Sequence, residues 1–111
     1  MIYNGLTFEQ AITDRKAWGR IFESGIGAYL VSQAFIRRFE LFYWRERNDE
    51  VDFILRKNKS TVAIEIKSNA EKRTDGLERF KERFNPTTSF IVGDGGISAH
   101  DFFHMDLKKL F

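Results

Sequence analysis

Residues 50–68 read EVDFILRKNKSTVAIEIKS. Two runs rich in Val, Ile and Phe flank the polar RKNKS, which is typical of two antiparallel strands joined by a hairpin turn. A turn centred on Asn58 and Lys59 places apolar residues opposite one another on one face: Val51 with Ile66, Phe53 with Ile64, and Leu55 with Val62. A slip of one residue would bury charges, so the hydrophobic pattern fixes this register.

The opposite face of the predicted hairpin carries the charges. There Ile54 meets Ala63, Glu50 meets Lys67, and Asp52 meets Glu65. Opposed side chains have Cβ atoms about 5 Å apart, and like charges in such a pair destabilise the sheet. We therefore expect a cation beside Asp52 and Glu65. Lys67 supplies part of that charge, and Mg²⁺ or Mn²⁺, which take carboxylate ligands, would supply more.

The remaining segments predict the order α-β-β-β-α-β. Apolar residues at helical spacing predict a long helix over 13–35, with Thr13 or Asp14 as its N-cap. The other elements are strands over 39–47, 50–55, 61–67 and 88–93, a helix over 75–84 ended by Pro86, and one or two helical turns in the tail. The last strand follows a helical crossover, so we expect it to run parallel to the third. This predicts a mixed α/β sandwich.

Glu23 in WGRIFESGIGAYL lies beside the apolar face of the long helix. Its neighbours four residues away are Gly19 and Gly27, and each weakens the helix by up to about 1 kcal/mol relative to Ala. Glycines at these positions allow close packing against another backbone and leave Glu23 room to point at the sheet. We therefore add Glu23 to the candidate site.

Composition restricts the class of protein and the kinds of site that the chain can contain. The 111 residues predict a single domain over 1–111, with its core at about 13–103. A net charge of +2 permits a nucleic-acid partner without requiring one, and the absence of cysteine excludes thiolate metal sites. No apolar run reaches the roughly 18 residues of a membrane span. We expect a cytoplasmic chain with no membrane association. Without a GxxxxGK[ST] phosphate loop, no ATPase module or bound ATP is expected.

A helical Glu followed by Asp and then Glu-x-Lys on adjacent strands resembles the PD-(D/E)XK nuclease superfamily. The runs WGRIFESGIGAYL, LFYWRERNDEVDFIL, VAIEIKS, LERFKERF and FIVGDGGIS are similar, over about residues 16–103, to a C-terminal domain of unknown function on prokaryotic AAA+-type ATPases. The resemblance implies a restriction-endonuclease-like αβββαβ core, with a mixed central sheet flanked by helices. It implies metal ligation by Asp52, Glu65 and the Ile66 backbone carbonyl, with Lys67 as catalytic lysine and Glu23 as accessory acid.

Three functions stay open on this reading, the third being a junction-resolving nuclease similar to the archaeal resolvases. The first is a Mg²⁺-dependent endonuclease that hydrolyses DNA, as a module or fragment of an AAA+-type ATPase. The second is an inactive nuclease-fold module that binds DNA or a protein partner for an ATPase. Partners are thus DNA, an ATPase module or a second copy, as in resolvases, which share the motif order and act as dimers.

Other residues have weaker claims to a role. Candidate phosphate contacts are Arg45, Arg47, Lys57 and Lys59, although a solvated rim explains them equally well. Core packing explains most of Phe42, Tyr43 and Trp44 better than base stacking does. His100 and His104 are expected to be surface histidines, and residues 93–96 a tight turn.

Overall fold

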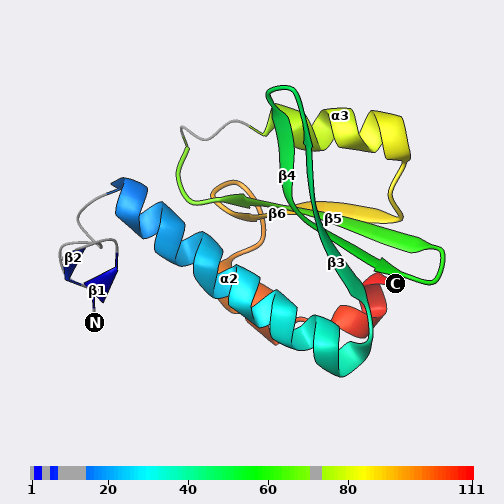
Figure 1. Cartoon of the computed structure of the whole chain (residues 1–111), viewed down its shortest axis with the longest axis horizontal. Helices are drawn as coiled ribbons and strands as arrows, with labels where there is room; N and C mark the ends of the chain where they lie inside the picture. Colours follow the sequence, from blue (N-terminus) through cyan, green and yellow to red (C-terminus); the bar gives the residue numbers. More distant parts are fainter. Residues whose placement is uncertain (1, 4–5, 8–14, 71–73) are drawn as a thin grey trace.

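The computed structural model describes residues 2–3, 6–7, 15–70 and 74–111, with side chains from Phe22 onward (Figure 1). The predicted N-cap at Thr13 or Asp14 lies outside these ranges. The main elements are α2 (Arg15–Arg37), β3 (Glu40–Glu46), β4 (Asp49–Lys57), β5 (Ser60–Lys67), α3 (Asp75–Phe84) and β6 (Thr88–Gly93). Shorter ones are β1 (Ile2–Tyr3), β2 (Leu6–Thr7), α4 (Ala99–His104) and the 3₁₀ helix η1 (Leu107–Leu110).

The four longer strands form one mixed sheet in the order β3-β4-β5-β6. The first two pairings are antiparallel, and β5 pairs with β6 in parallel, as the crossover through α3 predicts. Helix α3 covers one face of the sheet, and α2 lies on the other side (Figure 1). The predicted α/β class, the αβββαβ order and the mixed sheet flanked by helices are therefore confirmed. No helix of the described residues is long and apolar enough to cross a membrane.

The central hairpin has the predicted register over its turn-proximal half. Phe53 pairs with Ile64, Ile54 with Ala63, and Leu55 with Val62. The loop is Asn58–Lys59, as expected, and Asn58 has a φ of 56°. Asparagine tolerates this left-handed conformation better than most residues, which explains how a turn without glycine closes the hairpin.

The far half of the hairpin departs from the prediction because β4 bulges. Phe42 of β3 faces Ile54, but Trp44 faces Val51, so two residues of β4 oppose one residue of β3. A bulge of this kind shifts the alternation of side chains by one. Val51 consequently packs with Ile54 on the α3 side, and its predicted place beside Phe53 is wrong.

Apolar side chains form two cores, one on each face of the sheet. The larger lies on the α2 side and contains Ile26, Leu30, Phe39, Leu55, Val62, Ile64, Ile66, Val92, Phe102 and Leu107. The tail supplies Phe102 from α4 and Leu107 from η1, so its predicted helical turns close this core. The smaller core joins α3 to the sheet through Val51, Ile54, Ala63, Leu77 and Phe80. Strand β5, buried on both faces, is the centre of the molecule.

Helix α3 spans the predicted residues and ends at a left-handed residue. Asn85, with φ 47° and ψ 62°, donates its N–H to the Lys81 carbonyl, and Pro86 follows. At its start, a Cβ on Gly76 would overlap the backbone of Glu50 in β4. Glycine thus allows the first turn of α3 to rest directly on β4, near the acidic end of the hairpin.

Candidate functional site

The carboxylate of Asp52 is tied to the neighbouring strand. Its Oδ2 accepts a hydrogen bond of 2.8 Å from the backbone N–H of Ile66. The β4–β5 ladder ends at Phe53 and Ile64, so the predicted pairing of Asp52 with Glu65 lies outside it. There, the side chain of Asp52 accepts the hydrogen bond that a backbone carbonyl of β4 would accept in a continuous ladder. It is thereby fixed against the Glu65-Ile66-Lys67 triplet of β5.

Glu65 is 2% exposed, and it is the one charged side chain buried to this degree in the part of the chain whose side chains are described. It lies on β5 between Ile64 and Ile66, both 0% exposed, and pairs in register with Ile91 of β6. An ionised carboxylate in such surroundings is costly unless it is hydrogen-bonded, paired or bound to a cation. The position favours a functional carboxylate over a solvated one.

Lys67, the last residue of β5, pairs across the sheet with Gly93 of β6. Its Nζ lies 3.8 Å from Oδ2 of Asp94, and the Asp94 N–H donates to the Lys67 carbonyl at 2.8 Å. Asp94 was expected only as part of a tight turn, so sequence reasoning missed it at the site. The parallel pairing was the available signal, because it brings the carboxyl ends of β5 and β6 to one edge.

Glu50, the predicted partner of Lys67, is engaged elsewhere. The Tyr43 hydroxyl donates a 2.6 Å hydrogen bond to Glu50 Oε2. This hydrogen bond, which stabilises the neutral phenol next to a carboxylate, raises the pKa of Tyr43 above its ordinary value of 10.0, and a small loss of hydration adds to the effect. The bulge explains the change, because it turns Glu50 toward β3, where its register partner is Arg45.

Glu23 is half-buried in α2, one turn before Gly27. A Cβ on Gly27 would stand 3.2 Å from the ring of Phe53, so this glycine lets α2 approach β4 beside Asp52. The close approach at Gly27 is therefore to the side chain of Phe53 and not, as predicted, to another backbone. Across the described residues, no group of three or more His, Asp or Glu side chains could hold a metal ion. The site therefore centres on two carboxylates, Asp52 and Glu65.

The four predicted phosphate contacts lie at opposite ends of β4. Arg45, near the end of β3, and Arg47, in the β3–β4 turn, lie near the Lys67 end of the hairpin, and the Arg45 Nε donates to the Arg47 carbonyl at 3.3 Å. Lys57 and Lys59 lie at the β4–β5 turn, about 30 Å away at 3.4 Å per residue. Lys57 Nζ donates to the Arg37 carbonyl at 3.1 Å. Arg45 and Arg47 are thus the pair that shares an end of the sheet with Lys67.

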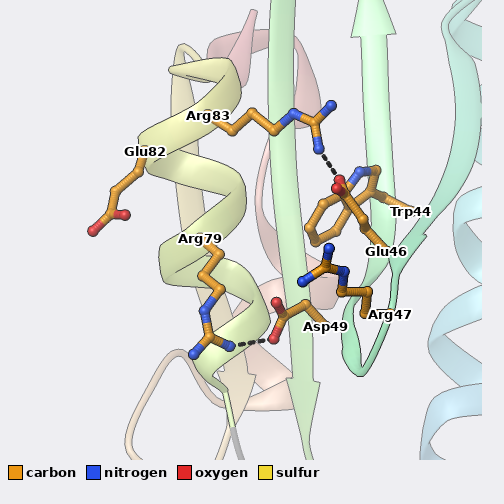
Figure 2. Close-up of a pocket in the computed structure, with 7 residues that line it drawn as sticks. All are labelled: Trp44, Glu46, Arg47, Asp49, Arg79, Glu82 and Arg83. Carbon is orange, nitrogen blue, oxygen red and sulfur yellow. Dashed lines mark hydrogen bonds and ion pairs between the residues drawn. The ribbon is translucent and has the colours of Figure 1, made fainter.

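A pocket of about 460 Å³ opens between α3 and the β3–β4 hairpin (Figure 2). Trp44 lines it, and two ion pairs cross it, Arg79 with Asp49 and Arg83 with Glu46. A second pocket of about 420 Å³ also borders Trp44 and is lined otherwise by Phe42, Ile54, Arg56, Thr61, Phe80 and Phe84. The two pockets, which share Trp44, together form a groove along α3 that was not predicted from the sequence. The signal was the spacing of Arg79 and Arg83, four residues apart on one face of α3.

The aromatic residues of β3 divide between core and surface. Trp44 packs edge-on against Phe80 and Phe84, with ring centroids 5.3 and 6.0 Å away. Phe42 and Tyr43 are exposed, so the expectation that most of the three serve core packing is wrong. Both residues lie on an edge strand, where only one neighbour is available to cover them. His100 and His104 are exposed, as expected, with their rings stacked at 4.4 Å.

Comparison with known proteins agrees with the resemblance at the level of the family. The sequence model of DUF4143, a domain of unknown function, matches residues 18–101. No curated protein and no solved structure matches the chain. The matched segment runs from the first turn of α2 into α4 and includes every residue of the candidate site. The chain therefore belongs to the DUF4143 family.

Proposed function

We propose that this chain is a PD-(D/E)XK-type, metal-dependent nuclease domain that hydrolyses phosphodiester bonds in DNA. The observation that carries the proposal is the hydrogen bond from the Ile66 N–H to Asp52. It fixes one carboxylate beside the strand segment that holds a second, buried carboxylate and a lysine. Two acids at one strand end repel each other unless a cation lies beside them.

The donor set suits Mg²⁺ or Mn²⁺. These ions prefer oxygen ligands, and Mg²⁺ is commonly held by one or two carboxylates while keeping several waters. Asp52, Glu65 and the Ile66 carbonyl would hold such an ion. The ion would lower the pKa of a bound water and stabilise charge on the phosphoryl group. The burial of Glu65 supports this assignment, because a cation offsets the cost of an ionised carboxylate in the core.

The other side chains have separate roles in the proposal. Lys67 would orient the attacking water and take up or release its proton. Asp94, whose Oδ2 is 3.8 Å from Nζ, would hold the ammonium group in position. Glu23 acts as an accessory acid on α2, through solvent rather than as a third direct ligand. These roles need no change in the backbone arrangement of β4 and β5.

The family suggests where the domain acts. DUF4143 domains are commonly found at the C-terminus of AAA-type ATPases. We propose that this domain, too, works with an ATPase module in the cytoplasm, with that module supplying ATP binding. Arg45 and Arg47, at the same end of the sheet as Lys67, would contact phosphates on either side of the cleaved bond.

A second candidate function is a non-catalytic module that binds nucleic acid or a protein. The groove along α3 favours it. Trp44 offers an aromatic surface between two pockets, and bases stack on such side chains for about 1–3 kcal/mol each. Arg47 and Arg56 border the two pockets and are exposed. On this alternative, binding would depend on Trp44 and on salt, and would not depend on Asp52.

The two functions are separated by one experiment. Supercoiled and branched DNA are incubated with Mg²⁺ or Mn²⁺ and wild-type chain, Asp52→Asn or Lys67→Gln. Asp101→Asn and Lys109→Gln, at exposed positions in the tail, are the matched controls. The proposal predicts cleavage by wild type and both controls, and loss of cleavage in both site variants. Equal background cleavage by all five proteins would refute the enzymatic function. Loss of DNA binding in Trp44→Ala would then support the second candidate function.

A further inference from the structure

The outward face of α2 exposes large apolar side chains that the described fold does not cover. Phe35 is 86% exposed, Ile36 64% and Val31 62%. Successive helical residues are rotated by about 100°, so these three share an outward arc of about 140° with exposed Gly25, Ala28 and Ser32. No charged residue occurs from residue 24 to residue 36. A solvated helix face is normally charged or polar, and a contiguous apolar face marks an interaction site.

Gly25 sets this face apart from the sheet-facing side of the same helix. Nothing lies within 4 Å of where a Cβ on Gly25 would be, whereas at Gly27 the Phe53 ring is 3.2 Å away. Glycine weakens a helix interior relative to alanine, and no neighbour within the described fold requires it at position 25. Close contact with a group outside the described fold would explain its presence.

We propose that this face of α2 is a homodimer interface, in which the α2 helices of two copies pack antiparallel about a two-fold axis. The face has small residues, Gly25 and Ala28, toward its N-terminal end. It has large ones, Phe35 and Ile36, toward its C-terminal end. Antiparallel packing brings Phe35 of each copy over Gly25 of the other. One patch is then complementary to itself, as a two-fold interface requires.

The absence of charge disfavours a charged partner and suits a second copy. A partner with charged residues opposite this stretch would bury them without counter-charges, which is costly. A second copy presents the same uncharged surface. The uncharged stretch of α2, residues 24–36, is about 20 Å long. Phe103, which is 41% exposed and 4.9 Å from the Tyr29 ring, widens the patch.

The test is the mass of the chain in solution, measured by sedimentation over a range of concentrations. Wild type is expected to be a dimer that dissociates on dilution. Phe35→Glu is expected to raise the dissociation constant at least tenfold, because the substitution enters the interface twice. Phe42→Glu, an equivalent change at an exposed aromatic residue of β3, is the matched control and should leave the dimer intact.

Cross-linking gives a second measurement. The chain has no cysteine, so Ser32→Cys supplies a single thiol near the proposed axis. A short bis-maleimide should convert this variant to a covalent dimer, and adding Phe35→Glu should abolish that product. A monomeric mass at every concentration would overturn the proposal. So would a dimer insensitive to Phe35→Glu, or equal weakening by Phe42→Glu. None of these outcomes bears on cleavage by the Asp52 site, so the two proposals fail independently.

Discussion

Asp52 and Ile66, on adjacent strands, are joined by a side-chain-to-backbone hydrogen bond of 2.8 Å at the point where the β4–β5 ladder ends. One carboxylate therefore has two tasks. It satisfies a buried backbone donor, and it stands beside Glu65 and Lys67. The two tasks can be separated by substitution, because an amide keeps the acceptor while losing the charge.

Replacing Asp52 separates the structural task from the chemical one. Asp52→Ala should lower the free energy of unfolding by about 1–3 kcal/mol, since Ile66, which is 0% exposed, loses the acceptor for its N–H. Asp52→Asn should cost less, because the amide oxygen can still accept this hydrogen bond. Urea denaturation of the three proteins measures the difference. Equal losses in both variants would show that the charge, not the hydrogen bond, stabilises the hairpin.

Mn²⁺ should raise the melting temperature of the wild-type chain. A ligand that binds only the folded state, at about 100 times its Kd, adds about 2.7 kcal/mol of stability. For a domain of this size that corresponds to roughly 10–20 °C. Asp52→Asn and Glu65→Gln should show little or no shift, and Asp101→Asn should respond as wild type does. The measurement is thermal unfolding with Mn²⁺ or with chelator. A shift that persists in Asp52→Asn would place the ion elsewhere.

Gly93 should not tolerate a side chain. Its φ is 117°, and a Cβ there would overlap the carbonyl oxygen of Lys67. Gly93→Ala should therefore cost at least about 2 kcal/mol, from backbone strain together with the displaced end of β5. Gly95→Ala is the matched control. Its φ is 75° but nothing lies within 4 Å of its Cβ position, so only strain of about 1–2 kcal/mol applies. Chemical denaturation gives both values, and equal costs would contradict the close approach.

The Tyr43–Glu50 hydrogen bond should make stability pH-dependent in the alkaline range. Folding raises the pKa of Tyr43 above 10.0, so the folded state holds the phenolic proton more tightly than the unfolded chain. The stabilisation is complete below pH 10 and is lost as the pH rises through the raised pKa. Tyr43→Phe should remove this part of the alkaline loss, as should Glu50→Gln. Denaturation across this range checks the sign, and identical pH profiles would contradict it.

Much of the architecture followed from the sequence because it depends on local patterns. The alternation in residues 53–64 permits one register, since a slip would expose the apolar face. Helix α3 and strand β6 lie where helical spacing, Pro86 and a compact apolar run predicted them. The composition of residues 62–66 likewise predicted a strand of the core. Asp52, Glu65 and Lys67 lie at one end of the same predicted hairpin, so their proximity could also be predicted.

Other features depend on contacts between elements, which local patterns in the sequence do not specify. The bulge in β4 depends on how β3 pairs with it, and it moves Val51 to the other face and turns Glu50 to Tyr43. Asp94 reaches Lys67 only because β6 lies parallel to β5 after a crossover. The groove beside Trp44 and the uncovered face of α2 depend on where neighbouring elements pack. Periodicity along the chain assigns a residue to a face, but only packing determines what meets that face, because contacts between elements join residues far apart in sequence.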